Sequence, residues 1–213
     1  MPAPVLVCHR GASALATENT LDAFRIAMAH GIDFSELDVH IGHAGDLVVT
    51  HDAVEDRVAE RALPRLKDVF DLVRGQMGIY VELKGATTGA ALGDLLRQGA
   101  GEGVQLISGS ADLHLVAELR AAAPDLPRSI LFTREWQGRT RAMIDACLGL
   151  ECVYAHPCFR PIEPALIDAF QQAGLQVMTP HTNDADEARY FAAIGVNVVA
   201  SDDPRVLLPL RAC

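Results

Sequence analysis

Short apolar runs that alternate with amphipathic helix patterns are the feature of this sequence that most restricts its fold. The runs are rich in Val, Ile and Leu, and most are bounded by Gly, Pro or polar residues, which is typical of buried parallel strands. They lie at residues 5–8, 33–39, 78–83, 104–108, 128–132, 152–155, 175–179 and 197–200. Eight strands, each followed by a helix, predict an α/β protein with a TIM (β/α)8 barrel, although a doubly wound sheet shares this alternation.

The helix patterns between the runs have apolar residues three and four positions apart. They lie at residues 20–31, 63–75, 110–124, 164–174, 183–195 and 202–210. In the first pattern we expect Thr20 as the N-cap and Gly31 as the C-cap. The segment DLVVTHD at 46–52 predicts a short extension between the second strand and its helix. Half of the 213 residues are hydrophobic, which suits a single domain over residues 1–213.

Composition excludes several classes of partner. A formal net charge of -10 argues against a nucleic-acid surface, because phosphate backbones bind clustered basic side chains. No apolar stretch approaches the length needed to cross a bilayer, and the N-terminus MPAPVLVCHRG lacks the pattern of a signal peptide. We therefore expect a cytoplasmic protein without stable membrane insertion, and whether it forms a homo-oligomer stays open. The five cysteines form no CxxC motif and are expected to be reduced and mostly buried.

Polar residues follow the ends of the predicted strands, where function lies in a barrel of this kind. They are His9, Arg10, Glu36, Asp38, His51, Glu82, Lys84, Ser108, His156, His181, Ser201 and Asp202. Side chains two positions apart on a strand share a face, so Glu36 and Asp38 point the same way. If they point into the barrel mouth, Glu82 joins them there. Three such carboxylates repel one another unless a cation joins them, and their hard oxygens favour Mg²⁺ or Ca²⁺.

Two histidines and two basic side chains accompany these carboxylates. His9 and His51 are suited to general acid and general base catalysis. Arg10 and Lys84 add fixed positive charge. A cation with such neighbours suits a phosphate ester, because positive charge stabilises the phosphoryl oxygens while the histidines move protons.

Four segments together resemble one known family, the glycerophosphodiester phosphodiesterases. CHRGASALATENTLDAF at 8–24 resembles the family's opening signature, HRG followed by PENT. ELDVHIGHAGDLVVTHD at 36–52 resembles its E-x-D segment and the following His-Asp. VELK at 81–84 resembles its E-x-K, and GVNVVASDDP at 195–204 its closing motif. The matches are in order and span nearly the whole chain.

The resemblance implies a barrel that uses a divalent cation to hydrolyse glycerophosphodiesters to sn-glycerol 3-phosphate and an alcohol. His9 and His51 then match the acid–base pair of the family. The resemblance makes Glu36, Asp38 and Glu82 the metal ligands and Arg10 and Lys84 the phosphate contacts. It also makes Glu18 and Asn19 a pair that supports the site from behind.

The chain departs from the family pattern in three places. Thr17 stands where the family usually has Pro. Pro180 and His181 stand in place of the usual Trp of a Trp-Thr-Val-Asn motif, which alters the expected substrate wall. Residues 53–62 alone separate the His-Asp pair from the next helix pattern, so this is a short form that lacks most of the family's insertion.

Several interpretations of the substrate stay open. His156, His181 and Trp136 are candidates for a wall that contacts substrate. A sugar phosphodiester and a lysophospholipid are alternatives to a small-molecule glycerophosphodiester, although the loops carry no apolar run suited to lipid. A barrel that binds phosphodiesters without catalysis is the alternative from a different class.

Overall fold

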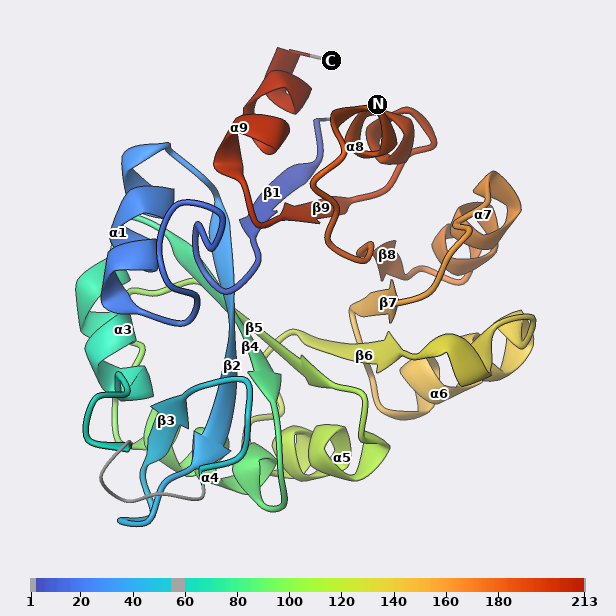
Figure 1. The fold of residues 1–213 in the computed structure, drawn as a ribbon. Coiled ribbons are helices and arrows are strands. Elements are labelled where there is room, and N and C mark those ends of the chain that lie inside the picture. Colours follow the sequence, from blue (N-terminus) through green and yellow to red (C-terminus); the bar gives the residue numbers. More distant parts are fainter. Residues whose placement is uncertain (1–2, 55–59, 213) are drawn as a thin grey trace.

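The strands form one sheet that curls into a nearly closed barrel, with helices around its outer side (Figure 1). The computed structural model describes residues 3–54 and 60–212. Hydrogen-bonded neighbours follow the order β8, β7, β6, β5, β4, β2, β1, β9, and each of these pairs is parallel. The strands are β1 (Val5–Cys8), β2 (Phe34–Ile41), β3 (Leu47–Val49), β4 (Gly78–Leu83), β5 (Leu106–Ser110), β6 (Arg128–Phe132), β7 (Tyr154–Pro157), β8 (Gln176–Val177) and β9 (Val198–Ser201).

Helices follow the strands in alternation. They are α1 (Leu21–Ala29), α3 (Leu66–Val73), α4 (Thr88–Arg97), α5 (Leu113–Ala122), α6 (Thr140–Gly149), α7 (Pro164–Gln172), α8 (Ala185–Ala193) and α9 (Pro204–Leu207), with 3-10 helices at Arg134–Trp136 and Leu208–Ala212. No helix of the described residues is both long and apolar enough to span a membrane.

The two ends of the sheet, β8 and β9, meet at a short seam. Met178 and Val198 form an isolated parallel bridge, and the backbone N–H of Asn197 donates to the carbonyl of Val177 over 3.0 Å. A doubly wound sheet would leave its outer strands apart, so this seam excludes that alternative. The predicted TIM (β/α)8 barrel is therefore confirmed.

Alternation of side chains along the strands separates an outer apolar core from an inner one. Leu37 and Val39 of β2 belong to the outer core, against the helices. The inner core consists of Val7, Tyr80, Ile107, Leu131, Met178 and Val198. Because neighbouring side chains on a strand point to opposite faces, Glu36 and Asp38 are directed into the barrel.

Some observed strand bounds differ from the predicted ones. They differ where backbone N–H or C=O groups at a strand end form hydrogen bonds with a neighbouring element. The run at 152–155 begins too early, because the N–H of Cys152 bonds the carbonyl of Cys147 at the end of α6. The run at 104–108 is two residues too early, because β5 continues to Ser110, and the hydroxyls of Ser108 and Ser110 donate to carbonyls of β4. Polar residues at a strand end are tolerated there because their hydrogen bonds are satisfied.

Two helices, α4 and α6, had no predicted pattern. On α4, Gly89 and Gly93 face α5 so closely that a Cβ on Gly93 would lie 2.3 Å from the Cβ of Ala122. Because glycines form this contact, the face of α4 toward α5 has no large apolar residue at these two positions by which the sequence could identify it. On α6 the buried side chains are Met143 and Cys147, too few to form a clear pattern.

Of the two caps predicted for the first helix, the N-cap Thr20 is correct and the C-cap is not. Thr20 Oγ1 accepts from the N–H of Ala23 at 3.3 Å and caps α1. At the other end His30 is the C-cap, and Gly31 follows it with a φ of +68°. The predicted C-cap was thus one residue late, since glycine serves here as the left-handed residue after the cap.

The extension predicted at 46–52 exists as β3, which pairs antiparallel with the end of β2. The short connection at 53–62 lies partly outside the described residues. Four described cysteines are free, and three of them are buried, in agreement with the expected reduced thiols.

Candidate active site

The loop after β1 places a histidine and an arginine at the barrel mouth. The N–H of His9 bonds the carbonyl of Ser201, which continues the pairing of β1 with β9. Arg10 has a φ of 56°, in the left-handed region that residues other than glycine rarely adopt. This turn aims the N–H of Arg10 at Glu36 Oε2, 2.9 Å away. The backbone therefore helps to hold the first carboxylate.

Three carboxylates converge inside the mouth from two neighbouring strands. Glu36 and Asp38 of β2 are 5% and 1% exposed, and Glu82 of β4 lies beside Asp38 in the strand register. One ligand oxygen from each lies within 4.8 Å of the other two. Burial raises the pKa of Glu36 well above its usual range, and the charges of Asp38 and Glu82 raise it further. The sequence prediction that these three side chains meet is confirmed by this geometry.

Two basic side chains offset part of this negative charge. Lys84 Nζ lies 2.7 Å from Glu82 Oε1 and 3.3 Å from Asp38 Oδ1. Arg10 Nε lies 3.2 Å from Asp38 Oδ2. Burial opposes the charge on Lys84, but Glu82 and Asp38 outweigh it and raise the pKa of that ammonium group. Both bases thus remain cationic beside the carboxylates.

The Glu18–Asn19 pair contacts two of these groups directly. Asn19 Nδ2 donates to Asp38 Oδ2 over 3.1 Å, and Glu18 Oε1 accepts from Arg10 Nη1 at 2.9 Å. Asn19 also has a positive φ, of 57°, and its N–H bonds the carbonyl of Arg10. The pair therefore orients one carboxylate and one basic side chain.

The donor set of the three carboxylates fits a hard divalent cation. Such ions take carboxylate oxygens, and convergent acids without a cation repel. Glu36 Oε1 is buried and has no hydrogen-bond partner among the described residues. A buried carboxylate oxygen without a partner is costly, so an ion at this position would complete the site.

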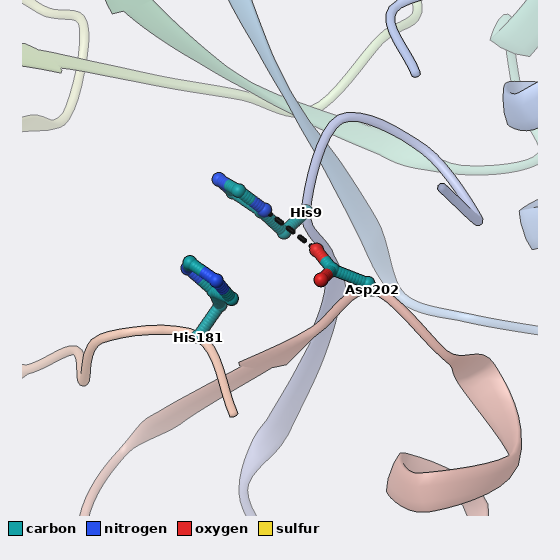
Figure 2. A group of neighbouring side chains, drawn as sticks. All are labelled: His9, His181 and Asp202. Atoms are coloured by element: carbon teal, nitrogen blue, oxygen red, sulfur yellow. Dashed lines mark hydrogen bonds and ion pairs between the residues drawn. The ribbon is translucent and has the colours of Figure 1, made fainter. Parts of the chain in front are cut away.

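His9 makes its ring contacts with residues from the far end of the chain (Figure 2). Its Nδ1 lies 2.7 Å from Asp202 Oδ1, just after β9, and its Nε2 lies 4.0 Å from Glu36 Oε2. Asn183 Nδ2 donates to the other oxygen of Asp202 over 2.7 Å. Although burial alone would raise the pKa of Asp202, the hydrogen bonds from His9 and Asn183 lower it. Asp202 is therefore an ionised acceptor for His9.

Asp202 and Asn183 are contributors to the site that the sequence interpretation left out. Asp202 stood among the residues at strand ends, but nothing local assigned it a partner. Its position directly after the last strand was the available signal, because all strand ends of a barrel meet at one mouth. Asn183 belongs to the Asn-Asp pair that begins the α8 pattern. It does not directly follow a strand, so its position did not indicate a place at the barrel mouth.

His51 lies at the end of the β3 extension and is more open to solvent. Its side chain is 40% exposed, and its Nδ1 lies 2.9 Å from Asp52 Oδ1. The N–H of Thr50 bonds the carbonyl of Asp38, which ties this segment to the carboxylate strand. No hydrogen bond or ion pair between the described residues joins His51 to His9, so any joint action would take place through a substrate.

A cavity of about 230 Å³ opens beside the carboxylates inside the barrel. Its lining includes His9, Glu36, Glu82, His156 and His181. Burial lowers the pKa of His156 to about 4, so this ring is neutral at neutral pH. Its Nε2 lies 3.0 Å from the carbonyl of Thr179.

The third candidate for a substrate wall, Trp136, has a different environment. Its ring packs edge-on against Phe132, with 5.1 Å between the ring centroids, and Arg139 lies over it. The structure thus places His156 and His181 in the lining of the cavity, whereas Trp136 packs against the outer apolar core.

Comparison with known proteins adds an independent result. The model of the glycerophosphoryl diester phosphodiesterase family matches residues 9–88. A glycerophosphodiester phosphodiesterase of Caldanaerobacter subterraneus subsp. tengcongensis is 24% identical over 97% of this chain and 97% of its own length.

Solved structures share the barrel. An Oleispira antarctica phosphodiesterase, solved in complex with the product sn-glycerol-3-phosphate, has a TM-score of 0.83 at 23% identity and covers 99% of this chain and 98% of its own. A glycerophosphodiester phosphodiesterase of Agrobacterium tumefaciens has a TM-score of 0.77 at 25% identity, with 96% and 99% covered. The matched segment begins at His9 and contains every predicted metal ligand, and the Caldanaerobacter relative aligns with 97% of the chain. Residues 9–88 of this chain thus match the glycerophosphoryl diester phosphodiesterase family, and the whole chain shares the barrel of the solved structures.

Proposed function

We propose that the protein hydrolyses glycerophosphodiesters to sn-glycerol 3-phosphate and an alcohol, with Mg²⁺ or Ca²⁺ held by Glu36, Asp38 and Glu82. The observation that carries this proposal is the convergence of three carboxylates, two of them buried, with one oxygen of Glu36 unpaired among the described residues. The match of residues 9–88 to the family model supports it, and so does the fold shared with a phosphodiesterase solved with sn-glycerol-3-phosphate. The domain that acts is proposed to span residues 1–213.

Positive charge at the mouth suits a phosphate group. A divalent cation at the carboxylates would supply charge that stabilises the phosphoryl oxygens as the ester bond breaks. Arg10 and Lys84 flank the same carboxylates and are proposed to contact the phosphate. The guanidinium of Arg10 can offer two donors to one phosphate, whereas Lys84 acts as a point charge.

Both proposed catalytic histidines have the same arrangement of ring nitrogens. Nδ1 of His9 faces Asp202, and Nδ1 of His51 faces Asp52. An ionised carboxylate can only accept, so each Nδ1 carries the proton and each Nε2 is left free. We assign proton transfer with the attacking and leaving oxygens to these two Nε2 atoms.

A product assay with metal control tests the proposal. Metal-free protein should be inactive on glycerophosphocholine, glycerophosphoethanolamine and glycerophosphoglycerol, and Mg²⁺ or Ca²⁺ should restore release of sn-glycerol 3-phosphate. Glu82→Gln should weaken cation binding measured by calorimetry, because it removes a charged ligand. Asp71→Asn, at an exposed carboxylate on α3, is the matched control and should bind the cation normally.

Three results would contradict the proposal. Full turnover after removal of metal would exclude the cation. Cleavage of a sugar phosphodiester or a lysophospholipid alone would reassign the substrate. Binding of glycerophosphodiesters without product would indicate a binding barrel.

A further inference from the structure

His181 lies face to face with His9 at the mouth of the barrel (Figure 2). The ring centroids are 4.0 Å apart and the planes differ by 6°. The two residues come from opposite ends of the chain, since His9 follows β1 and His181 lies in the segment between β8 and α8. His181 also stands where this chain departs from the family's Trp-Thr-Val-Asn pattern.

The peptide group between His181 and Thr182 is held at both its carbonyl oxygen and its N–H. Arg160 Nη2 donates to the carbonyl of His181 over 2.9 Å, while Arg160 also pairs through two nitrogens with the carboxylate of Glu187. Thr182 is 4% exposed, and its N–H bonds the carbonyl of Ala200 at 2.8 Å. Although the His181 side chain reaches solvent, its backbone position is therefore well defined.

The stacked geometry disfavours a shared metal ion at His9, His181 and Asp202, whose ligand atoms lie within 4.8 Å of one another. The lone pair of an imidazole nitrogen lies in the ring plane. Two parallel rings at 4.0 Å cannot both aim such lone pairs at an ion between them. The nearest oxygen of Asp202 already contacts Nδ1 of His9.

His9 needs a second constraint besides Asp202. Among the described residues its ring makes one hydrogen bond, at Nδ1, and a single hydrogen bond lets the ring tilt about that nitrogen. A tilt would move Nε2 away from the carboxylate cluster, where Glu36 Oε2 lies 4.0 Å from it. A ring stacked on one face limits that motion, because planar rings attract and exclude each other over their whole area.

We propose that His181 is a positioning residue that holds the plane of the His9 ring so that Nε2 faces the reacting phosphate. This inference rests on the proposed role of His9 in proton transfer. His181 acts through His9, so a flat ring at position 181 is what matters, and its nitrogens are not required.

Two substitutions separate a positioning role from a chemical one. His181→Ala removes the stack and should lower kcat by about tenfold to a hundredfold, with KM changed by less than about threefold, because misplacement of a catalytic group affects the chemical step. His181→Phe keeps a flat ring and should restore kcat to within about threefold of wild type. His114→Ala, at an exposed position on α5, is the matched control and should behave as wild type.

Wild-type kcat in His181→Ala would overturn the proposal. Equal loss in His181→Ala and His181→Phe would also overturn it, since the nitrogens would then be needed. Inactivity of the wild-type protein on glycerophosphodiesters would count against the proposed function instead.

Proton NMR tests the stack without turnover. The ring protons of His9 should shift upfield under the facing ring and lose that shift in His181→Ala, but retain an upfield shift in His181→Phe. Unchanged His9 resonances in His181→Ala would show that the rings are not stacked in solution.

Discussion

Asp202 determines which nitrogen of His9 can act as a base. One carboxylate oxygen faces Nδ1 of His9, and the other accepts from Asn183. Both oxygens therefore serve as acceptors, and an amide in the same place could satisfy just one of these two contacts. This makes the charge and the symmetry of the carboxylate important, as well as its size.

Asp202→Asn is expected to slow turnover by about a hundredfold or more. An amide NH₂ that faces Nδ1 would favour the proton on Nε2, which is the wrong tautomer for a base, and the reverse orientation would set the NH₂ against Asn183. Steady-state kinetics should show the loss in kcat, with cation binding retained in calorimetry. Asp203→Asn is the control, because Asp203 caps α9 and pairs with Arg205. A kcat near that of wild type in Asp202→Asn would remove Asp202 from the site.

At the level of elements, the seam between β8 and β9 has the shortest strand pairing in the barrel. β8 has two residues, and its link to β9 depends on a bridge at Met178 and on Asn197. Asn197 Oδ1 accepts from the N–H of Val177 at 2.8 Å, and the N–H of Asn197 donates back to the carbonyl of Val177. The side chain of Asn197 thus supplies a hydrogen bond that a longer strand pairing would otherwise provide through the backbone.

Asn197→Ala is expected to lower the free energy of unfolding by about 1–3 kcal/mol, because the N–H of Val177 would lose its acceptor in a partly buried place. Denaturant unfolding measures this change. Asn197→Asp keeps the acceptor and should cost less. Gln172→Ala is the neighbouring control, since Gln172 is exposed at the end of α7 and makes no hydrogen bond with the described residues of the seam. Equal stability of Asn197→Ala and wild type would show that the seam does not depend on this side chain.

For the whole molecule, buried titrating groups couple stability to pH. Burial lowers the pKa of His156 to about 4, against 6.5 for a free histidine. Between these values the unfolded chain binds more protons than the folded protein, so stability falls as pH decreases from 6.5 towards 4. The raised pKa of Glu36 acts in the opposite direction, which is why the effect must be measured as a difference between variants.

His156→Gln is expected to flatten the loss of thermal stability between pH 6.5 and 4. Glutamine can still donate to the carbonyl of Thr179 but gains no proton in this range. Melting temperatures of wild type and variant across this pH range measure the difference. His114→Gln, at an exposed histidine on α5, should leave the wild-type slope unchanged. Parallel curves for His156→Gln and wild type would mean that His156 does not contribute.

Most of the fold was predictable because buried parallel strands need continuous apolar runs. The strands at 5–8, 78–83 and 128–132 have the predicted bounds. Other predicted strand bounds were displaced. At β7, for example, the N–H of Cys152 bonds a carbonyl of α6 and does not join the sheet. Helix α4 left no pattern, because its contact with α5 uses glycines.

The sequence by itself determined which side chains share a strand face. Glu36 and Asp38, and likewise Glu82 and Lys84, are two positions apart, and the period of a strand then places each pair on one side. Only the tertiary structure decided what lies opposite them. His9 and Asp202 are 193 positions apart, and His181 reaches His9 just because the last strand closes onto the first. Such contacts depend on the curvature and closure of the sheet, which no local pattern encodes.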